Sequence, residues 1–95
     1  MAYLIGYRIR VKDYPAWKAN FDGSTPLRRK AGEKSYHLFR AATDPKDLTL
    51  LCEWDTAERA KRYLESPELA QAQQESGVTE LPDCMVLELI ERRGL

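Results

Sequence analysis

His37 is the only histidine in this chain of 95 residues, and it lies in a run of strand-forming residues. An imidazole titrates near neutral pH, so His37 could act as a general base on an acidic C–H group or a phenol. Trp54, at the end of a second such run, could stack on a planar ligand. We therefore predict His37 and Trp54 as a catalytic pair. The alternatives are a half-buried strand histidine and a core tryptophan whose indole N–H is hydrogen-bonded.

The turn expected at residues 44–47 sets the register that would bring this pair together. A symmetric loop gives the cross-strand pairs Thr43–Leu48, Ala41–Leu50, Phe39–Cys52 and His37–Trp54. This row is apolar, so we expect it to face the helices. The other face would carry Leu38, Arg40, Leu51 and Glu53, and an Arg40–Glu53 ion pair could form there. A one-residue bulge in the hairpin would exchange the two faces.

Four more side chains are predicted to contact a ligand in the same cleft. Trp17 and Tyr63 come from the two helical layers and would close the cleft from above, whereas Phe39 and Leu50 would contribute from the strands. Each aromatic residue also has a simple alternative role in the core. We expect the occupant of the cleft to be a small aromatic molecule.

The sequence lacks the motifs that mark common cofactors. It has no phosphate-binding glycine loop, no nucleophile elbow and no cluster of metal-binding residues. Cys52 and Cys84 lie far apart in strand-like runs, without a CxxC spacing or a nearby histidine, and are expected to be buried free thiols. We therefore expect no metal and no cofactor.

The composition is that of an ordinary globular protein, with 43% apolar and 32% charged residues. Fifteen basic residues balance fifteen acidic ones, so no net field favours nucleic acid or anionic lipid. The densest basic run, Arg28-Arg29-Lys30, is expected to be a solvated helix face. Met1 leads directly into Tyr3-Leu4-Ile5 without a basic stretch or a long apolar run, which argues against secretion and a membrane span and for the cytoplasm.

The elements that must position these residues follow from periodicity and turn signals. The expected order is βαββαβ, and each helical slot holds two short helices. The predicted strands cover residues 3–11, 34–43, 48–54 and 84–91. The helices are predicted to begin near Asp13, Thr25, Asp55 and Ser66, with Gly32 closing the second and Gly77 the fourth.

This order is that of an α+β, ferredoxin-like fold, a single domain over residues 1–95. Two right-handed crossovers place both helical layers on one face of a four-stranded antiparallel sheet. The other face would be bare, yet Leu4, Leu38 and Leu51 make it apolar. A second copy of the chain is the simplest cover, so we expect a homodimer whose sheets face each other.

Two stretches of the chain resemble a known family. They are DYPAWKANFD at residues 13–22, and CEWD at 52–55 running on to SPEL at 66–69. They are similar to the antibiotic-biosynthesis-monooxygenase-like family of dimeric α/β barrels, and the similarity covers essentially the whole chain. The resemblance implies two ferredoxin-like protomers whose sheets form a barrel, each with a cleft between helices and sheet. Members bind flat aromatic or polyketide-like molecules, or haem.

The functional residues of that family are matched only in part. Its cofactor-free oxygenases have a Trp near the end of the third strand, which Trp54 matches, but Leu50 or Cys52 stands where they have Asn. Tyr63 takes the place of a helix Tyr, loosely. The haem degraders have a His on the second helix, whereas His37 lies on the second strand, so haem degradation is disfavoured.

The resemblance implies a cofactor-independent monooxygenase that acts on aromatic or polyketide-like small molecules. One alternative is a non-catalytic dimer that binds a small molecule or has an accessory role. A polyketide cyclase or isomerase is the other.

Overall fold

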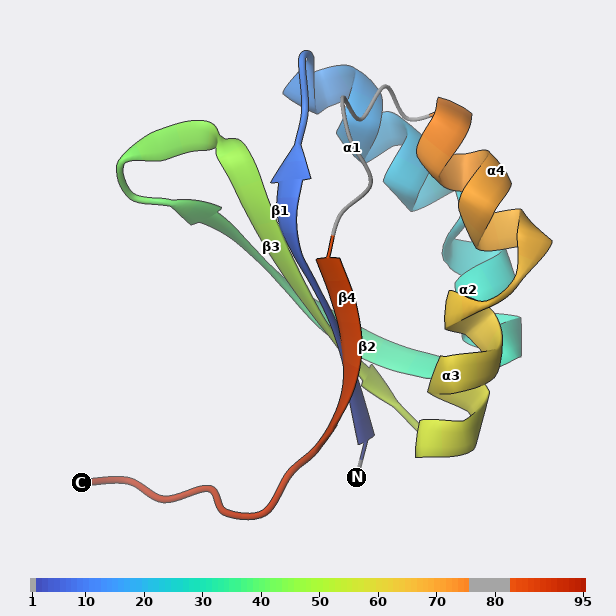
Figure 1. Ribbon diagram of the computed structural model, residues 1–95, viewed down its shortest axis with the longest axis vertical. Coiled ribbons are helices and arrows are strands. Elements are labelled where there is room, and N and C mark those ends of the chain that lie inside the picture. Colours follow the sequence, from blue (N-terminus) through green and yellow to red (C-terminus); the bar gives the residue numbers. More distant parts are fainter. Residues whose placement is uncertain (1, 76–82) are drawn as a thin grey trace.

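The computed structural model describes residues 2–75 and 83–95 and contains the predicted order of elements (Figure 1). The strands are β1 (Ala2–Arg10), β2 (Glu33–Ala41), β3 (Asp44–Trp54) and β4 (Asp83–Glu88). The helices are α1 (Tyr14–Gly23), α2 (Thr25–Ala31), α3 (Ala57–Leu64) and α4 (Pro67–Glu75). The prediction of a βαββαβ order with divided helical slots is therefore confirmed. The predicted helix end at Gly77 lies outside the described residues.

The four strands form one antiparallel sheet in the order β2-β3-β1-β4. The four helices lie over one face of this sheet, here called the helix-covered face (Figure 1). The opposite face, here called the open face, is bare of helices in the described parts of the chain. β4 ends at Glu88, before its predicted boundary, and residues 89–95 run away from the sheet on the side opposite the helices.

Side-chain caps explain where the helices begin. The carboxylate of Asp13 and the hydroxyl of Ser66 each accept a hydrogen bond from the backbone N–H three residues later, both at 3.2 Å. The start of α3 differs from the prediction, because Thr56 rather than Asp55 is its cap and accepts the corresponding bond at 3.1 Å. Asp55 instead forms an ion pair with Arg59 at 2.5 Å.

The register of the β2–β3 hairpin differs from the prediction. Its turn lies at residues 42–43, and Asp44 already belongs to β3. The observed pairs are His37–Leu51, Leu38–Leu50, Phe39–Thr49 and Arg40–Leu48. Compared with the predicted register, the partners are shifted by an odd number of residues, which moves the β2 side chains to the other face of the sheet and leaves those of β3 on the predicted face. The predicted His37–Trp54 pairing is therefore wrong.

A contact from β1 accompanies this shift. The Arg10 guanidinium donates to the Asp44 carboxylate at 2.6 Å, and the backbone N–H of Lys46 donates to the same carboxylate at 3.0 Å. These bonds, the one from Lys46 first, lower the pKa of Asp44. Because Arg10 also pairs with Asp47 across β1 and β3, the segment expected to be the turn extends β3 instead.

The corrected register changes which residues share a face. Leu38 packs into the core on the helix-covered face, and Arg40 has the same orientation by alternation. Leu51 and Glu53 lie on the open face, where Glu53 accepts a hydrogen bond from Ser35 at 3.2 Å. The predicted grouping of these four residues on one face is wrong, and the Arg40–Glu53 ion pair does not form within the protomer.

β1 changes face part of the way along its length. Its register with β3 shifts between Gly6 and Ile9, and Arg8 has a positive φ of 57° within this bulge. The alternation predicted over residues 3–11 is therefore interrupted. Tyr3 lies opposite Glu53 on the open face, whereas Ile9 is buried on the helix-covered face.

The core on the helix-covered face has two parts. The Trp54 cluster consists of Cys52, Trp54, Ala60 and Tyr63. The Trp17 cluster consists of Ile9, Val11, Trp17 and Leu48. Leu50 packs against both clusters and joins them. None of the helices in the described part of the chain is long and apolar enough to cross a membrane.

Candidate ligand-binding site

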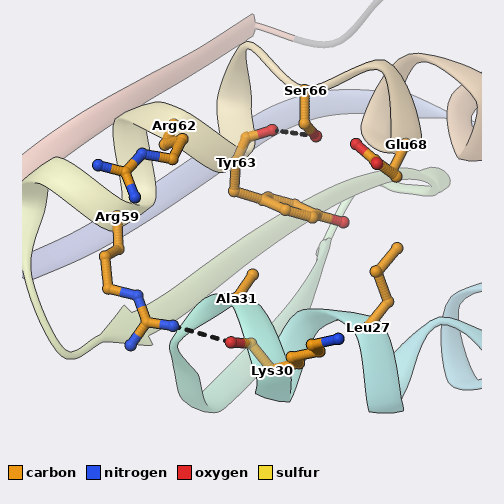
Figure 2. Close-up of a pocket in the computed structure, with 8 residues that line it drawn as sticks. All are labelled: Leu27, Lys30, Ala31, Arg59, Arg62, Tyr63, Ser66 and Glu68. Atoms are coloured by element: carbon orange, nitrogen blue, oxygen red, sulfur yellow. Dashed lines mark hydrogen bonds between the residues drawn. The ribbon is translucent and has the colours of Figure 1, made fainter.

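A pocket of about 330 Å³ opens between α2 and the corner where α3 meets α4 (Figure 2). Its lining residues are Leu27, Lys30 and Ala31 from α2, Arg59, Arg62 and Tyr63 from α3, Ser66 from the corner and Glu68 from α4. The two sides are tied together where the Arg59 guanidinium donates to the Lys30 carbonyl at 2.8 Å. The volume suits a small molecule of a few rings.

The pocket combines an apolar wall with a basic rim. Leu27 and Ala31 face the Tyr63 ring, which extends across the pocket in Figure 2. The rim is formed by Lys30, Arg59 and Arg62. The arginine charges are partly neutralised by Asp55 at 2.5 Å and Glu58 at 3.2 Å. The rim thus offers hydrogen-bond donors to oxygen atoms of a ligand without a large excess of positive charge.

Tyr63 links the pocket to the core. Its ring centroid lies 5.1 Å from that of Trp54, at an interplanar angle of 36°. Its carbonyl accepts a hydrogen bond from the Ser66 hydroxyl at 2.6 Å, which fixes the corner at the end of α3 (Figure 2). Burial raises the pKa of Tyr63 to about 12. The residue therefore remains a neutral phenol and can donate a proton or a hydrogen bond, but it is no base at neutral pH.

A buried ion pair lies beside the Trp54 cluster. Arg28 Nε donates to Glu33 Oε2 at 2.5 Å, and the two side chains are only 4% and 6% exposed. The same guanidinium donates to the Phe21 carbonyl at 2.5 Å and to the Ser24 hydroxyl, and it stacks 3.6 Å from the Phe21 ring centroid. These contacts compensate the burial of the positive charge. The prediction that residues 28–30 form a solvated face is therefore wrong for Arg28.

The Glu33 carboxylate influences its neighbours. Burial first, and then the negative charge of Glu33, raise the pKa of the Cys52 thiol far above its ordinary value. The thiol therefore stays protonated and is no nucleophile. Both cysteines are free thiols; Cys52 is buried, as predicted, whereas Cys84 is only half-buried. Within residues 2–75 and 83–95 no group of acidic, histidine or cysteine side chains is arranged to hold a metal ion.

The structure divides the residues that were predicted to form one site. Trp54 and Tyr63 contact each other, with Leu50 packed against their cluster. Trp17 belongs to the other cluster. Their roles in binding a ligand stay predictions.

His37 and Phe39 lie elsewhere, on the open face, with their rings stacked at a centroid distance of 6.2 Å. The predicted hairpin register was wrong, and the prediction therefore placed these two side chains on the helix-covered face. They cannot line a cleft with Trp54 inside one protomer.

Arg28 and Glu33 are the residues that sequence reasoning missed. They are five positions apart and are separated by Gly32, whose φ of 125° turns the chain from α2 into β2. A Cβ at this position would lie 2.6 Å from Asp55 Oδ1, so a side chain would not fit. Gly32 was predicted as a helix end, and an acid directly after it, facing a basic last turn, is the one local signal that could have indicated the pair.

Comparisons with known proteins bear on the fold. Neither a family model nor a curated protein matches the chain. A solved structure of a provisionally named antibiotic biosynthesis monooxygenase from Bordetella bronchiseptica is similar, with a TM-score of 0.75, 19% identity, and coverage of 95% of this chain and 97% of the other. A provisionally named monooxygenase of the same kind from Deinococcus radiodurans has a TM-score of 0.68 and 16% identity, covering 100% and 98%.

A third solved structure is an ethyl tert-butyl ether d (ethd) family protein from Bacillus halodurans, with a TM-score of 0.62, 21% identity and coverage of 95% and 99%. These similarities extend over nearly the whole of each chain. The predicted ferredoxin-like fold is therefore confirmed, and so is the resemblance in fold to proteins named antibiotic biosynthesis monooxygenases.

Proposed function

We propose that this protein binds a small, oxygen-bearing aromatic molecule in the pocket between α2 and α3. The observation that carries the proposal is the joining of an aromatic wall, Tyr63, to a rim of donors from Lys30, Arg59 and Arg62. A flat ring can pack between Tyr63 and Leu27, while carbonyl or hydroxyl oxygens at its edge accept hydrogen bonds from the rim.

We further propose that the bound molecule is oxidised by O₂ without a cofactor. Support comes from the similar solved structures that are named monooxygenases. An anthrone-type substrate can supply all the electrons itself. One oxygen atom replaces the two hydrogens of its CH₂ group and forms a carbonyl, and the other oxygen atom leaves with those hydrogens as water. Tyr63, as a neutral phenol, can donate to the oxygen that is being reduced.

A non-catalytic role in binding is the second candidate. It is favoured by the absence of histidine from the pocket wall, where Glu68 is the only carboxylate among the eight lining residues. A cyclase or isomerase needs a base near the ligand, and the proposed base His37 lies on the open face.

Oxygen uptake and binding together distinguish these candidates. Wild-type protein is offered anthrone and quinol substrates in an oxygen electrode, and binding of the same compounds is measured by calorimetry. Leu27→Trp fills the pocket and should abolish both signals. Leu89→Trp is the matched control, because Leu89 has nearly the same exposure (43% against 42%) but lies beyond the end of β4. Binding without uptake would leave only the non-catalytic role, and uptake that survives Leu27→Trp would exclude this pocket.

We also propose that two copies of the chain pair through their open faces. Phe39 and Met85 are 53% and 44% exposed there, and Leu51 and Leu87 are partly exposed beside them. A sheet with apolar side chains on both faces and helices on one needs a second cover. Met85→Lys should shift the sedimentation coefficient at micromolar concentration from that of a dimer to that of a monomer. The control Leu27→Lys, at an exposed position on the helical side, should leave the sedimentation coefficient of the dimer unchanged. A wild-type protein that sediments as a monomer would contradict the proposal.

A further inference from the structure

Two buried polar atoms lie beside the Trp54 cluster without a hydrogen-bond partner in the described part of the chain. They are Glu33 Oε1 and Trp54 Nε1. Their residues are directly opposite each other, because Glu33 pairs with Trp54 where β2 begins and β3 ends. Side chains of such a cross-strand pair stand next to each other on one face. The two unpartnered atoms therefore belong to a single location on the helix-covered face.

The chemistry of the two atoms is complementary. The indole N–H of Trp54 can only donate a hydrogen bond, and the carboxylate of Glu33 can only accept one. The second oxygen of this carboxylate accepts from Arg28 at 2.5 Å, and the Cys52 thiol also interacts with the carboxylate, while Oε1 has no hydrogen-bond partner among the described residues. Trp54 is 1% exposed and the Glu33 side chain 6%, so bulk water does not satisfy either atom. Polar atoms buried in this way are usually paired in folded proteins.

We infer that Glu33 and Trp54 form the recognition site for a hydroxyl group of the ligand. A hydroxyl oxygen accepts from Trp54 Nε1 while its hydrogen is donated to Glu33 Oε1, so one group satisfies both atoms. A carbonyl or ether oxygen would leave Glu33 without a donor, and an anionic oxygen would be repelled by it. The ligand class is therefore phenols, enols and aromatic alcohols. An ordered water molecule is the other source of the same hydroxyl chemistry.

The inference rests on the proposed pocket, from which a ligand would reach this location. Ala31 and Tyr63 line the pocket and also belong to, or pack against, the Trp54 cluster. Rotation of the Tyr63 side chain away from the Trp54 ring would connect the two spaces. The backbone around the location is held in place, because the Asp55 N–H donates to the Gly32 carbonyl at 3.1 Å. This bond joins the residue before Glu33 to the residue after Trp54.

Three probes of nearly equal size test the hydroxyl preference on wild-type protein. They are 1-naphthol, 1-methoxynaphthalene and naphthalene, with affinities measured by calorimetry. We expect 1-naphthol to bind at least about tenfold more tightly than either of the others, because only its hydroxyl satisfies both buried atoms. Equal binding of 1-naphthol and 1-methoxynaphthalene would overturn the role of Glu33. Equal binding of all three would show that only water occupies the site and would overturn the inference, although the proposed pocket would stand.

Binding of none of the three probes would contradict the proposed pocket itself, and the inference would fail with it. The failure of the inference alone is thus distinguishable from the failure of the proposed function.

A spectroscopic readout locates the hydroxyl. In ¹⁵N-labelled protein the two tryptophans give two indole N–H signals, and Trp17→Phe identifies the one from Trp54. We expect 1-naphthol to shift the Trp54 signal and to leave that of Trp17 in place. A shift of the Trp17 signal alone would overturn the inference.

Matched variants complete the test. Trp54→Phe and Glu33→Gln should reduce the tenfold preference for 1-naphthol to about twofold or less, because each weakens one of the two hydrogen bonds. The control Glu53→Gln changes a glutamate on the open face and should keep the preference. If Glu33→Gln does not fold, Trp54→Phe and the wild-type probe series still decide the matter. A preference that survives Trp54→Phe would overturn the inference.

Discussion

The two tryptophan clusters lie on the same face of the same sheet, yet they differ in chemistry. In the Trp17 cluster every member is apolar, and Trp17 stacks on Phe21 with centroids 5.2 Å apart and an interplanar angle of 8°. The Trp54 cluster contains a thiol and a phenol, and Glu33 of the buried ion pair lies opposite Trp54, whereas its partner Arg28 stacks on Phe21 beside the Trp17 cluster. A pocket lies over the second cluster, with Tyr63 as its wall.

This difference is consistent with different roles for the two parts of the core. Apolar packing such as that around Trp17 stabilises a fold without polar groups. Buried ion pairs and unpartnered polar atoms give no stability advantage over well-packed apolar residues. Their concentration around Trp54 therefore supports a role in binding for that end of the sheet, and four changes can break or sharpen the contrast.

The largest effect is expected from Arg28→Met. Removal of the guanidinium leaves the Glu33 charge buried without its partner, which should lower the free energy of unfolding by about 3–5 kcal/mol. Urea denaturation measures this loss. Arg29→Met is the matched control at the exposed neighbouring position and should change stability by less than about 0.5 kcal/mol. A small effect of Arg28→Met would mean that the ion pair is dispensable to the Trp54 cluster.

Leu48→Ala probes the other cluster. Leu48 is 2% exposed in the Trp17 cluster, and loss of its side chain should leave a cavity and cost about 3 kcal/mol of unfolding free energy. The affinity for 1-naphthol should stay within about twofold of wild type, since stability and binding are assigned to different clusters. A large loss of affinity in calorimetry, with the protein still folded, would remove the distinction between them.

A pH dependence should distinguish Tyr63 from an exposed tyrosine. Because the pKa of Tyr63 is raised from 10 to about 12 in the folded state, the folded protein holds this proton more tightly than the unfolded chain. The corresponding stability is fully present below pH 10 and is lost as the pH rises toward 12, by about 1–2 kcal/mol. Tyr63→Phe should flatten this decline in urea midpoints.

The pKa of Cys52 is also raised, so this thiol contributes to the loss of stability at high pH. The test therefore compares the pH dependence of stability between variants and does not require Tyr63→Phe to be independent of pH. The exposed Tyr14→Phe is the control and should decline as wild type does. If the stability of Tyr63→Phe and of wild type declined identically with pH, the raised pKa of Tyr63 would be contradicted.

The smallest effect is expected from His37→Ala. His37 is exposed on the open face, so the stability of the protomer should change by less than about 0.5 kcal/mol. The affinity for 1-naphthol should not change either, because the side chain lies on the other side of the sheet from the pocket. A tenfold loss of affinity would show that His37 contributes to ligand binding. Because His37 lies on the open face, it would then have to contact the ligand bound to the other copy of a dimer.

The elements of this fold could be predicted because their signals are local. Caps such as Asp13 and Ser66, and the alternation of apolar residues in strands, act within a few positions of the chain. The hairpin register also involves β1, because Arg10 pairs with Asp47 and reaches Asp44 in the segment expected to be the turn. Such a contact between distant segments leaves no periodic pattern in the sequence, and its consequence was the wrong face for His37.

The candidate site was predictable only in part for a related reason. Trp54 and Tyr63 were identified because aromatic residues at strand ends and on helix stripes carry a recognisable pattern. Arg28 stood in a basic run, and composition gave no sign that this one of three cations is 3% exposed. Its burial results from the turn at Gly32, which places Glu33 within reach of the guanidinium.

Two of the three register shifts in the described sheet flank the same residue. Leu48 pairs with Ile9 beside the β1 bulge and with Arg40 beside the shift in β2. For the divergence of related sequences this means that an insertion or deletion of one residue at either point moves the side chains of the strand beyond it to the opposite face. Chain length at these two points, more than residue identity, decides which surface a side chain serves. Two homologues that differ there by one position can display the same motif on opposite sides of the molecule.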